Sequence, residues 1–167
     1  MKVLISHPTG NQNVRAAAMG FVELGIPISF HTTIATFSGD VFDRLSELNA
    51  FSALSRRRYD DRIRNFTITS PWREMGRLIS SRFGLYNLTR GERGVFSIDS
   101  VYRSLDKRVA TTLTTRNGSA TDAVYCYEDG ALFSFRKAKE LGIRCFYDLP
   151  IGYWRAGRSM MQEEKER

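Results

Sequence analysis

Residues 122–148 read D-A-V-Y-C-Y-E-D-G-A-L-F-S-F-R-K-A-K-E-L-G-I-R-C-F-Y-D. Ala123–Tyr127 is a short run of apolar and aromatic residues, which predicts a buried strand. Residues 131–141 repeat apolar side chains at helical spacing, Gly142 is a helix stop, and Cys145–Tyr147 predicts a second strand. The expected inward face of this helix is Leu132, Phe135 and Ala138. A strand, a helix and a strand in this order are typical of a parallel βαβ unit.

The same alternation runs back to the N-terminus. Further strands are expected at Val3–Ser6, Ile28–Thr33 and Phe66–Thr69, and residues 84–94 are rich in glycine and arginine, which predicts a loop. Four further helices are expected, each after a residue that can begin a helix. The first follows Asn13 and has the inward face Val14, Ala18, Phe21 and Val22, and the second follows Asp40 and has Val41, Phe42, Leu45 and Leu48. The third follows Ser70-Pro71 and has Trp72, Met75, Ile79 and Phe83, and the fourth follows Ser97 or Asp99 and has Ile98, Val101, Leu105 and Val109.

This pattern predicts an α/β fold: a Rossmann-like three-layer α/β/α arrangement whose parallel sheet is covered on both faces. We expect residues 1–167 to form a single domain. A last helix is expected from Tyr153 onward, and its polar end without a turn signal indicates a domain cut from a longer protein.

Positive charge is concentrated in one segment. The chain has a net charge of +7, and residues 56–93 carry ten arginines against four acidic residues. Such a segment can attract phosphate groups, an anionic membrane surface or nucleic acid. The alternative is a solvated surface with incidental charge. The chain shows no helix-turn-helix, RNA-recognition or zinc pattern, so specific nucleic-acid binding is not expected.

The cysteines and histidines do not form a metal motif. Cys126 and Cys145 are 19 residues apart with no CxxC pattern, and His7 and His31 lie far from them in sequence. We expect both thiols to be reduced, in neighbouring strands, and no metal to be bound. The chain shows no signal peptide and no long apolar run, which predicts a cytoplasmic protein.

Three polar loops follow predicted strands, where open parallel sheets bind ligands. The first loop contributes candidate side chains or backbone at His7, Gly10, Asn11, Asn13 and Arg15. It precedes a helix N-terminus that can receive an anion, or it is a solvated turn with Asn13 as cap. No GxGxxG, Walker, GxSxG or HExxH motif is present, so a dinucleotide or hydrolase function is poorly supported.

The second and third loops add acids and aromatic rings. Glu128 and Asp129 could accept hydrogen bonds from sugar hydroxyls, or one of them could serve as a base. Alternatively, Asp129 could simply cap the following helix. The third loop supplies Tyr147 and Asp148, followed by Tyr153 and Arg155. Aromatic faces beside hydrogen-bonding groups suit carbohydrate or nucleotide rings. The alternative is a structural corner whose aromatic rings fill the core, which leaves Asp148 unexplained.

Residues 122–155, together with the N-terminal strand and its Gly/Asn-rich loop, resemble the N-terminal domain of retaining GT-B glycosyltransferases (the glycosyltransferase family 4-like, or group 1, proteins). The family run K-x-x-G-I/V-P-x-x-x-x-H-D corresponds to residues 139–148, which keep Lys139, Gly142 and Ile143. Tyr147-Asp148 stands at the place of the His-Asp pair, two residues earlier than in the pattern, and Arg144 stands at the proline. The loop around Gly10 matches the family loop that reaches the donor phosphates.

The resemblance implies one half of a GT-B fold: an acceptor-binding domain of an enzyme that transfers a sugar from a nucleotide-sugar donor. The donor would bind a C-terminal domain that these 167 residues do not contain, so the chain alone is expected to be inactive. Its expected partners are that domain, as an excised or a separate chain, and a sugar or glycolipid acceptor. Peripheral contact with the inner face of the membrane through residues 56–93 is also expected. The alternative function is a non-enzymatic module that docks this basic segment on anionic lipid or on phosphate-containing partners.

Overall fold

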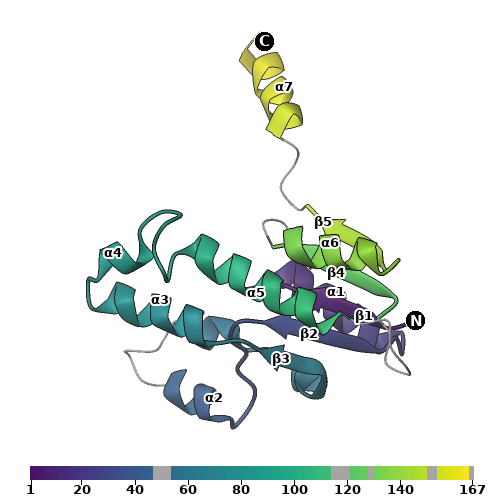
Figure 1. The fold of residues 1–167 in the computed structure, drawn as a ribbon, viewed down its shortest axis with the longest axis horizontal. Helices are drawn as coiled ribbons and strands as arrows, with labels where there is room; N and C mark the ends of the chain where they lie inside the picture. The colour runs from purple at the N-terminus through teal and green to yellow at the C-terminus, as the bar shows by residue number, and fades with distance from the viewer. Residues whose placement is uncertain (47–53, 114–120, 128–129, 150–153, 166–167) are drawn as a thin grey trace.

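A parallel five-stranded sheet forms the centre of the protein in the computed structural model, which describes residues 1–46, 54–113, 121–127, 130–149 and 154–165. The strands are β1 (Val3–Ser6), β2 (Ile28–Thr32), β3 (Thr67–Thr69), β4 (Ala123–Tyr127) and β5 (Arg144–Asp148). They lie in the order β3-β2-β1-β4-β5, and every neighbouring pair is parallel (Figure 1). The predicted Rossmann-like three-layer α/β fold is therefore confirmed.

Two apolar cores lie on opposite faces of this sheet. Helix α1 (Gln12–Glu23) buries Val14 and Ala18 against one face, as its spacing predicts. Helices α5 (Ile98–Thr112) and α6 (Leu132–Glu140) cover the other face. The remaining elements are α2 (Val41–Ser46), the 3-10 helix η2 (Asp61–Phe66), α3 (Trp72–Arg82), α4 (Tyr86–Thr89) and α7 (Trp154–Lys165). No helix among the described residues has both the length and the apolar content needed to cross a membrane.

Several local predictions are confirmed and others are shifted. Asp40 caps α2, since its Oδ1 accepts a hydrogen bond from the Asp43 N–H, and Ser97 rather than Asp99 caps α5. The prediction that Asn13 caps α1 is wrong, because the Asn11 side chain accepts the hydrogen bond from the Val14 N–H at 2.9 Å. Residues 84–94 include the short helix α4, and the predicted strand start at Phe66 belongs to η2.

The predicted inward face of α3 is wrong. Trp72, Ile79 and Phe83 are exposed, and the buried positions are Glu74 and Ser80. The helix extends beyond the sheet and contacts α4 and α5 (Figure 1), so it has no strand surface on which to bury that face. A buried ion-pair cluster orients it instead: Arg57 and Arg77 both donate to the Glu74 carboxylate, at 2.5 and 2.7 Å. Ile98 of α5 and Leu132 of α6 were also expected inward, and both are exposed.

The N-terminus of α6 is capped from another helix. Ala131, at the cap position, makes no side-chain hydrogen bond to the helix. Asp129, which the sequence offers as a cap for this helix, lies outside the described residues. The buried Asp106 carboxylate of α5 accepts the backbone N–H groups of Phe133 and Ser134 at 2.7 and 2.9 Å. A carboxylate at this position satisfies two free donors and also complements the helix dipole.

Replacing Asp106 with alanine should therefore lower the free energy of unfolding by about 2–3 kcal/mol, because two buried N–H groups lose a charged acceptor. Asp106→Asn, which keeps one carbonyl oxygen, should lose less. Urea denaturation followed by circular dichroism measures both. The control is Asp99→Ala, an exposed position on the same helix, which should cost under about 1 kcal/mol. Equal losses at positions 99 and 106 would contradict the capping role.

Candidate functional site

The order of the strands places a topological switch point between β1 and β4. The chain adds β2 and β3 on one side of β1 and then returns to place β4 and β5 on the other side. The segment after β1 leads to α1 on one face, and the segment after β4 leads to α6 on the other (Figure 1). Open α/β sheets bind ligands at such a switch point, outside the carboxyl ends of the strands. We call the residues at this position the switch-point site: His7, Asn13, Tyr125, Tyr127 and Asp148.

His7 is held in one tautomer by its own loop. Its Nδ1 accepts the backbone N–H groups of Thr9 and Gly10 at 3.0 and 2.6 Å, so Nε2 carries the proton of the neutral ring. The ring is buried and packs edge-on against Tyr127, with 4.6 Å between centroids. Burial, with the positive charges of Arg57 and Arg15, lowers the pKa of His7 to about 4. His7 is thus a neutral N–H donor at physiological pH.

Gly10 and Arg15, both predicted as site residues, have structural roles. Gly10 has φ +61°, and a Cβ there would lie 1.5 Å from the Tyr59 hydroxyl oxygen, so only glycine fits. Arg15 stacks over the Tyr59 ring and donates to the carbonyl oxygens of Gly10, Arg56 and Arg58 at 2.6–2.8 Å. Its guanidinium therefore joins the loop after β1 to residues 56–58.

Asn13 and Tyr127 come together at the switch point. The Asn13 amide donates to the Tyr127 hydroxyl at 3.5 Å, which links the first turn of α1 to the end of β4. Asn11 is engaged as the cap of α1. The loop after β1 thus places one exposed amide, Asn13, beside the neutral ring of His7 and the hydroxyl of Tyr127.

Asp148 and Tyr147 lie on opposite faces of β5. The Tyr125 hydroxyl donates a short hydrogen bond to the Asp148 carboxylate on the α1 face. Burial and this bond raise the pKa of Tyr125. The Asp148 charge opposes the lowering of the His7 pKa, which places the carboxylate within electrostatic range of that ring. Asp148 therefore belongs to the switch-point site.

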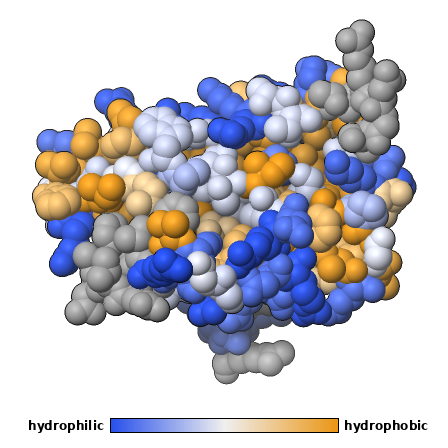
Figure 2. All heavy atoms as spheres, turned by 90° about the horizontal axis from the view of Figure 1, so that it is seen from below, coloured by the Kyte–Doolittle hydropathy of each residue, from blue (hydrophilic) through white to orange (hydrophobic). Residues whose placement is uncertain are grey.

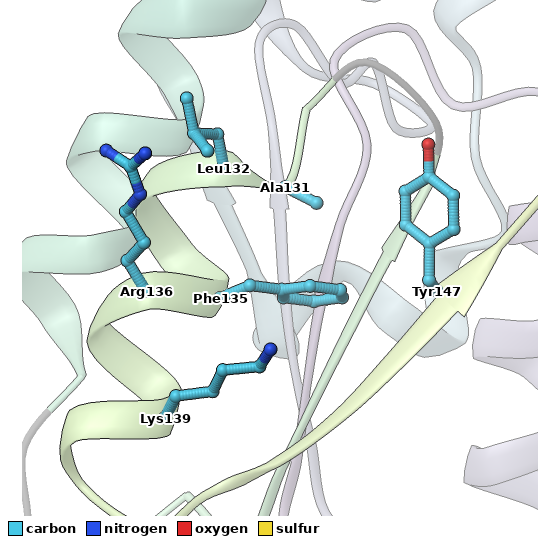
Figure 3. Close-up of a pocket in the computed structure, with 6 residues that line it drawn as sticks. All are labelled: Ala131, Leu132, Phe135, Arg136, Lys139 and Tyr147. Atoms are coloured by element: carbon cyan, nitrogen blue, oxygen red, sulfur yellow. The ribbon is translucent and has the colours of Figure 1, made fainter.

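Tyr147 faces α6 instead. In Figure 3 the Phe135 side chain extends from α6 toward the Tyr147 ring on β5, across a hollow between these two elements, and the ring centroids are 6.1 Å apart. The hollow has a volume of about 530 Å³ and is also lined by Arg136 and Lys139. Tyr147 is thus separated by the sheet from the side chains of His7 and Asp148.

Some predicted site residues lie outside the described chain. Glu128, Asp129 and Tyr153 are among these, and Arg155 falls within α7 with no side-chain description. Among the described residues, no group of three histidine, cysteine or acidic side chains could hold a metal ion. Cys126 and Cys145 are free thiols in the neighbouring strands β4 and β5, as expected, and burial raises the pKa of Cys126 to about 12.

The sequence prediction missed Tyr125, Tyr127 and Arg57. The two tyrosines alternate along β4, and period-two alternation places both on the α1 face of the sheet, so this signal was present. Arg57, whose charge helps to lower the pKa of His7, had no such signal. Its place in the fold depends on the return of residues 54–58 to the loop after β2, where the Thr36 N–H donates to the Arg57 carbonyl oxygen at 2.9 Å.

We expect Gly10→Ala to destabilise the protein by about 2–4 kcal/mol, since the methyl group would overlap Tyr59 and alanine disfavours a positive φ. The matched control is Gly25→Ala. Gly25 has a similar φ of +67° with no atom within 4 Å of the added carbon, so it should lose only the backbone contribution of about 1 kcal/mol. Thermal and urea unfolding measure both. Losses of the same size would mean that the contact with Tyr59 is unimportant.

Both histidines should stay neutral down to about pH 5, because burial lowers the pKa of His31 as well as His7 to about 4. Unfolded histidine titrates near 6.5, so between these values the unfolded state binds more protons and stability falls as pH falls. The free energy of unfolding should drop by about 2 kcal/mol per histidine from pH 7 to pH 5. NMR titration of the two imidazoles and urea denaturation at both pH values measure this. His31→Gln should remove about half of the drop, and rings that titrate near 6.5 in the native protein would contradict it.

Comparison of the chain with protein-family models, with curated proteins and with solved structures found no match.

Proposed function

We propose that the protein is the acceptor-side, N-terminal domain of a GT-B glycosyltransferase. In this proposal the switch-point site forms one wall of the active site, and a nucleotide-sugar donor binds on a second domain. One observation carries it: a neutral histidine, an amide, two tyrosines and a carboxylate come together at the switch point between β1 and β4. The Rossmann-like sheet and the resemblance over residues 122–155 support it further.

The chemistry of these groups suits a sugar hydroxyl. The Nε2–H of His7 and the Asn13 amide can donate hydrogen bonds, and the Tyr127 hydroxyl can donate or accept them. The Asp148 carboxylate already accepts the Tyr125 hydroxyl, and a carboxylate has capacity for further donors. A sugar acceptor offers hydroxyl groups that both donate and accept, together with C–H faces that pack on aromatic rings.

Asp148 is the residue that the proposal places closest to the acceptor. Its partner Tyr125 fixes the orientation of the carboxylate and keeps its own proton, because the pKa of the phenol is raised. A carboxylate held in this way can align an acceptor hydroxyl for attack on the donor sugar, and alignment of the reacting groups is a large part of catalysis.

The test is an assay of the natural full-length protein with a panel of nucleotide sugars, following release of the nucleoside diphosphate with and without candidate acceptors. Asp148→Asn should lower kcat/KM for transfer by about 10–100-fold, which corresponds to one lost charge-assisted hydrogen bond. Tyr125→Phe should have a smaller effect, because it alters only the orientation of the carboxylate.

The matched control is Asp99→Asn, an exposed acid on α5, which should leave transfer unchanged. Unfolding midpoints of all variants must agree with that of the parent protein for the comparison to hold. If no nucleotide sugar is hydrolysed or transferred by the full-length protein, or if Asp148→Asn retains full transfer, the proposal is wrong.

A further inference from the structure

Helices α3 and α4 and the start of α5 form an end of the molecule that extends past the sheet (Figure 1). Six large apolar side chains are exposed there, and we call them the apolar tip: Phe83, Leu85, Tyr86, Leu88, Val95 and Ile98. Phe83 and Tyr86 are 74% and 70% exposed. Figure 2 shows hydrophobic atoms gathered at this end, on the left of the view, with hydrophilic atoms beside them. An exposed cluster of this kind indicates an interaction surface.

A basic cleft adjoins the apolar tip. It has a volume of about 310 Å³, and its lining includes four basic side chains, Arg73, Arg93, Arg103 and Lys107, against the single acid Glu92. Val95 of the apolar tip lines the same cleft, and the Phe96 N–H donates to the Leu88 carbonyl oxygen at 2.8 Å, which holds this wall beside α4. The apolar and basic groups therefore form one continuous surface.

Hydrogen bonds within the protein fix the wall of the basic cleft. The Arg73 guanidinium donates to the Val95 carbonyl oxygen at 2.7 Å and to the Ser100 hydroxyl at 2.6 Å, so one cation fixes the cleft wall. Its buried Nε–H has no hydrogen-bond partner among the described residues. Arg103 and Lys107 are one turn apart on α5, and like charges at this spacing repel each other unless an anion lies between them.

Ion pairs neutralise several arginines elsewhere in the protein, but none is formed by the basic side chains of the cleft within the described residues. Much of the arginine-rich segment 56–93 is paired with acids: Arg57 and Arg77 with Glu74, Arg58 with Asp43, Arg62 with Asp60 and Glu23, and Arg64 with Asp61. Within the described chain, Arg93, Arg103 and Lys107 form no ion pair. The positive charge of the basic cleft thus comes from Arg73 and Arg93 of the arginine-rich segment and from Arg103 and Lys107 of α5.

We propose that the apolar tip and the basic cleft together dock the protein on an anionic lipid bilayer, with lipid phosphate groups in the cleft. Aliphatic and aromatic side chains enter the headgroup region, whereas arginine and lysine extend to the phosphates. Charge complementarity selects an anionic surface, and the exposed apolar tip favours a bilayer over a soluble polyanion, which has no apolar interior to receive it.

Docking itself does not depend on sugar transfer. Helix α3 begins just after the carboxyl end of β3, so the tip extends from the same edge of the sheet that carries the switch-point site. A docked protein would therefore hold this edge near the bilayer. If the proposed glycosyltransferase function holds, this placement favours a lipid-linked acceptor, and that consequence rests on the proposed function.

The test is co-sedimentation of the protein with vesicles made of equal parts phosphatidylcholine and phosphatidylglycerol, compared with phosphatidylcholine alone. We expect binding only to the anionic vesicles. The double variant Arg103→Gln, Lys107→Gln should weaken it about thirtyfold, from the contribution of two basic residues near a charged membrane. The matched control is Arg136→Gln, Lys139→Gln on α6, which removes the same charge from another surface and should change binding by less than about threefold.

A second pair of variants tests the apolar tip. Leu85→Ser with Tyr86→Ser should weaken vesicle binding at high salt as well as at low salt, because the lost contribution is not electrostatic. In the Tyr86→Trp variant, brominated lipids should quench the new fluorescence if the side chain enters the bilayer. This measurement does not depend on a loss of function.

Three results would overturn the proposal: no binding to anionic vesicles, equal weakening by the α5 and α6 double variants, or no quenching of Tyr86→Trp. Binding of inorganic phosphate or single-stranded RNA without vesicle binding would assign the cleft to a soluble anion or to nucleic acid instead. Vesicle binding is measured without any nucleotide sugar, so its failure and the failure of sugar transfer are distinguishable.

Discussion

The burial of β1 on both faces and along both edges is the constraint on which the rest of the structure depends. Its four residues are buried, and their backbones pair with β2 on one side and with β4 on the other. A strand in this position must be apolar on both faces, and its backbone groups must all be paired in the sheet. Because the chain leaves β1 toward α1 and leaves β4 toward α6, the two connections diverge, and the switch point follows from the topology.

Buried carboxylates in this protein hold helices in place. Glu74 binds Arg57 and Arg77 and orients α3, while Asp106 caps α6 from α5. Neither acid belongs to the switch-point site. Asp148 differs, since it is only partly buried, its described partner is a neutral phenol and it lies within electrostatic range of His7. Glu74 and Asp106 thus stabilise the fold, whereas Asp148 has an oxygen that a ligand could reach.

Two surfaces share one edge of the sheet. The switch-point site lies between β1 and β4, and the apolar tip extends from the same carboxyl edge through α3. The projection of α3 explains why its apolar residues are exposed: the Glu74 cluster occupies the buried side of the helix, so Trp72, Ile79 and Phe83 face outward. The sequence of a helix can thus predict an apolar face directed at the core, although in the folded protein that face is exposed to solvent.

The amino-acid sequence by itself determined the α/β class, the positions of the five strands to within a residue or two, and the loop from His7 to Asn13 as a candidate site. These features depend on local periodicity and turn chemistry, which neighbouring residues impose. Only the tertiary structure decided that Arg15 joins two loops, and that the α1 face of the sheet receives Asp148 whereas the α6 face receives Tyr147. It also decided which arginines are neutralised and which face the basic cleft. Those outcomes depend on pairs such as Arg57 with Glu74 and Arg73 with Ser100, which are distant in sequence and meet only when the chain has folded.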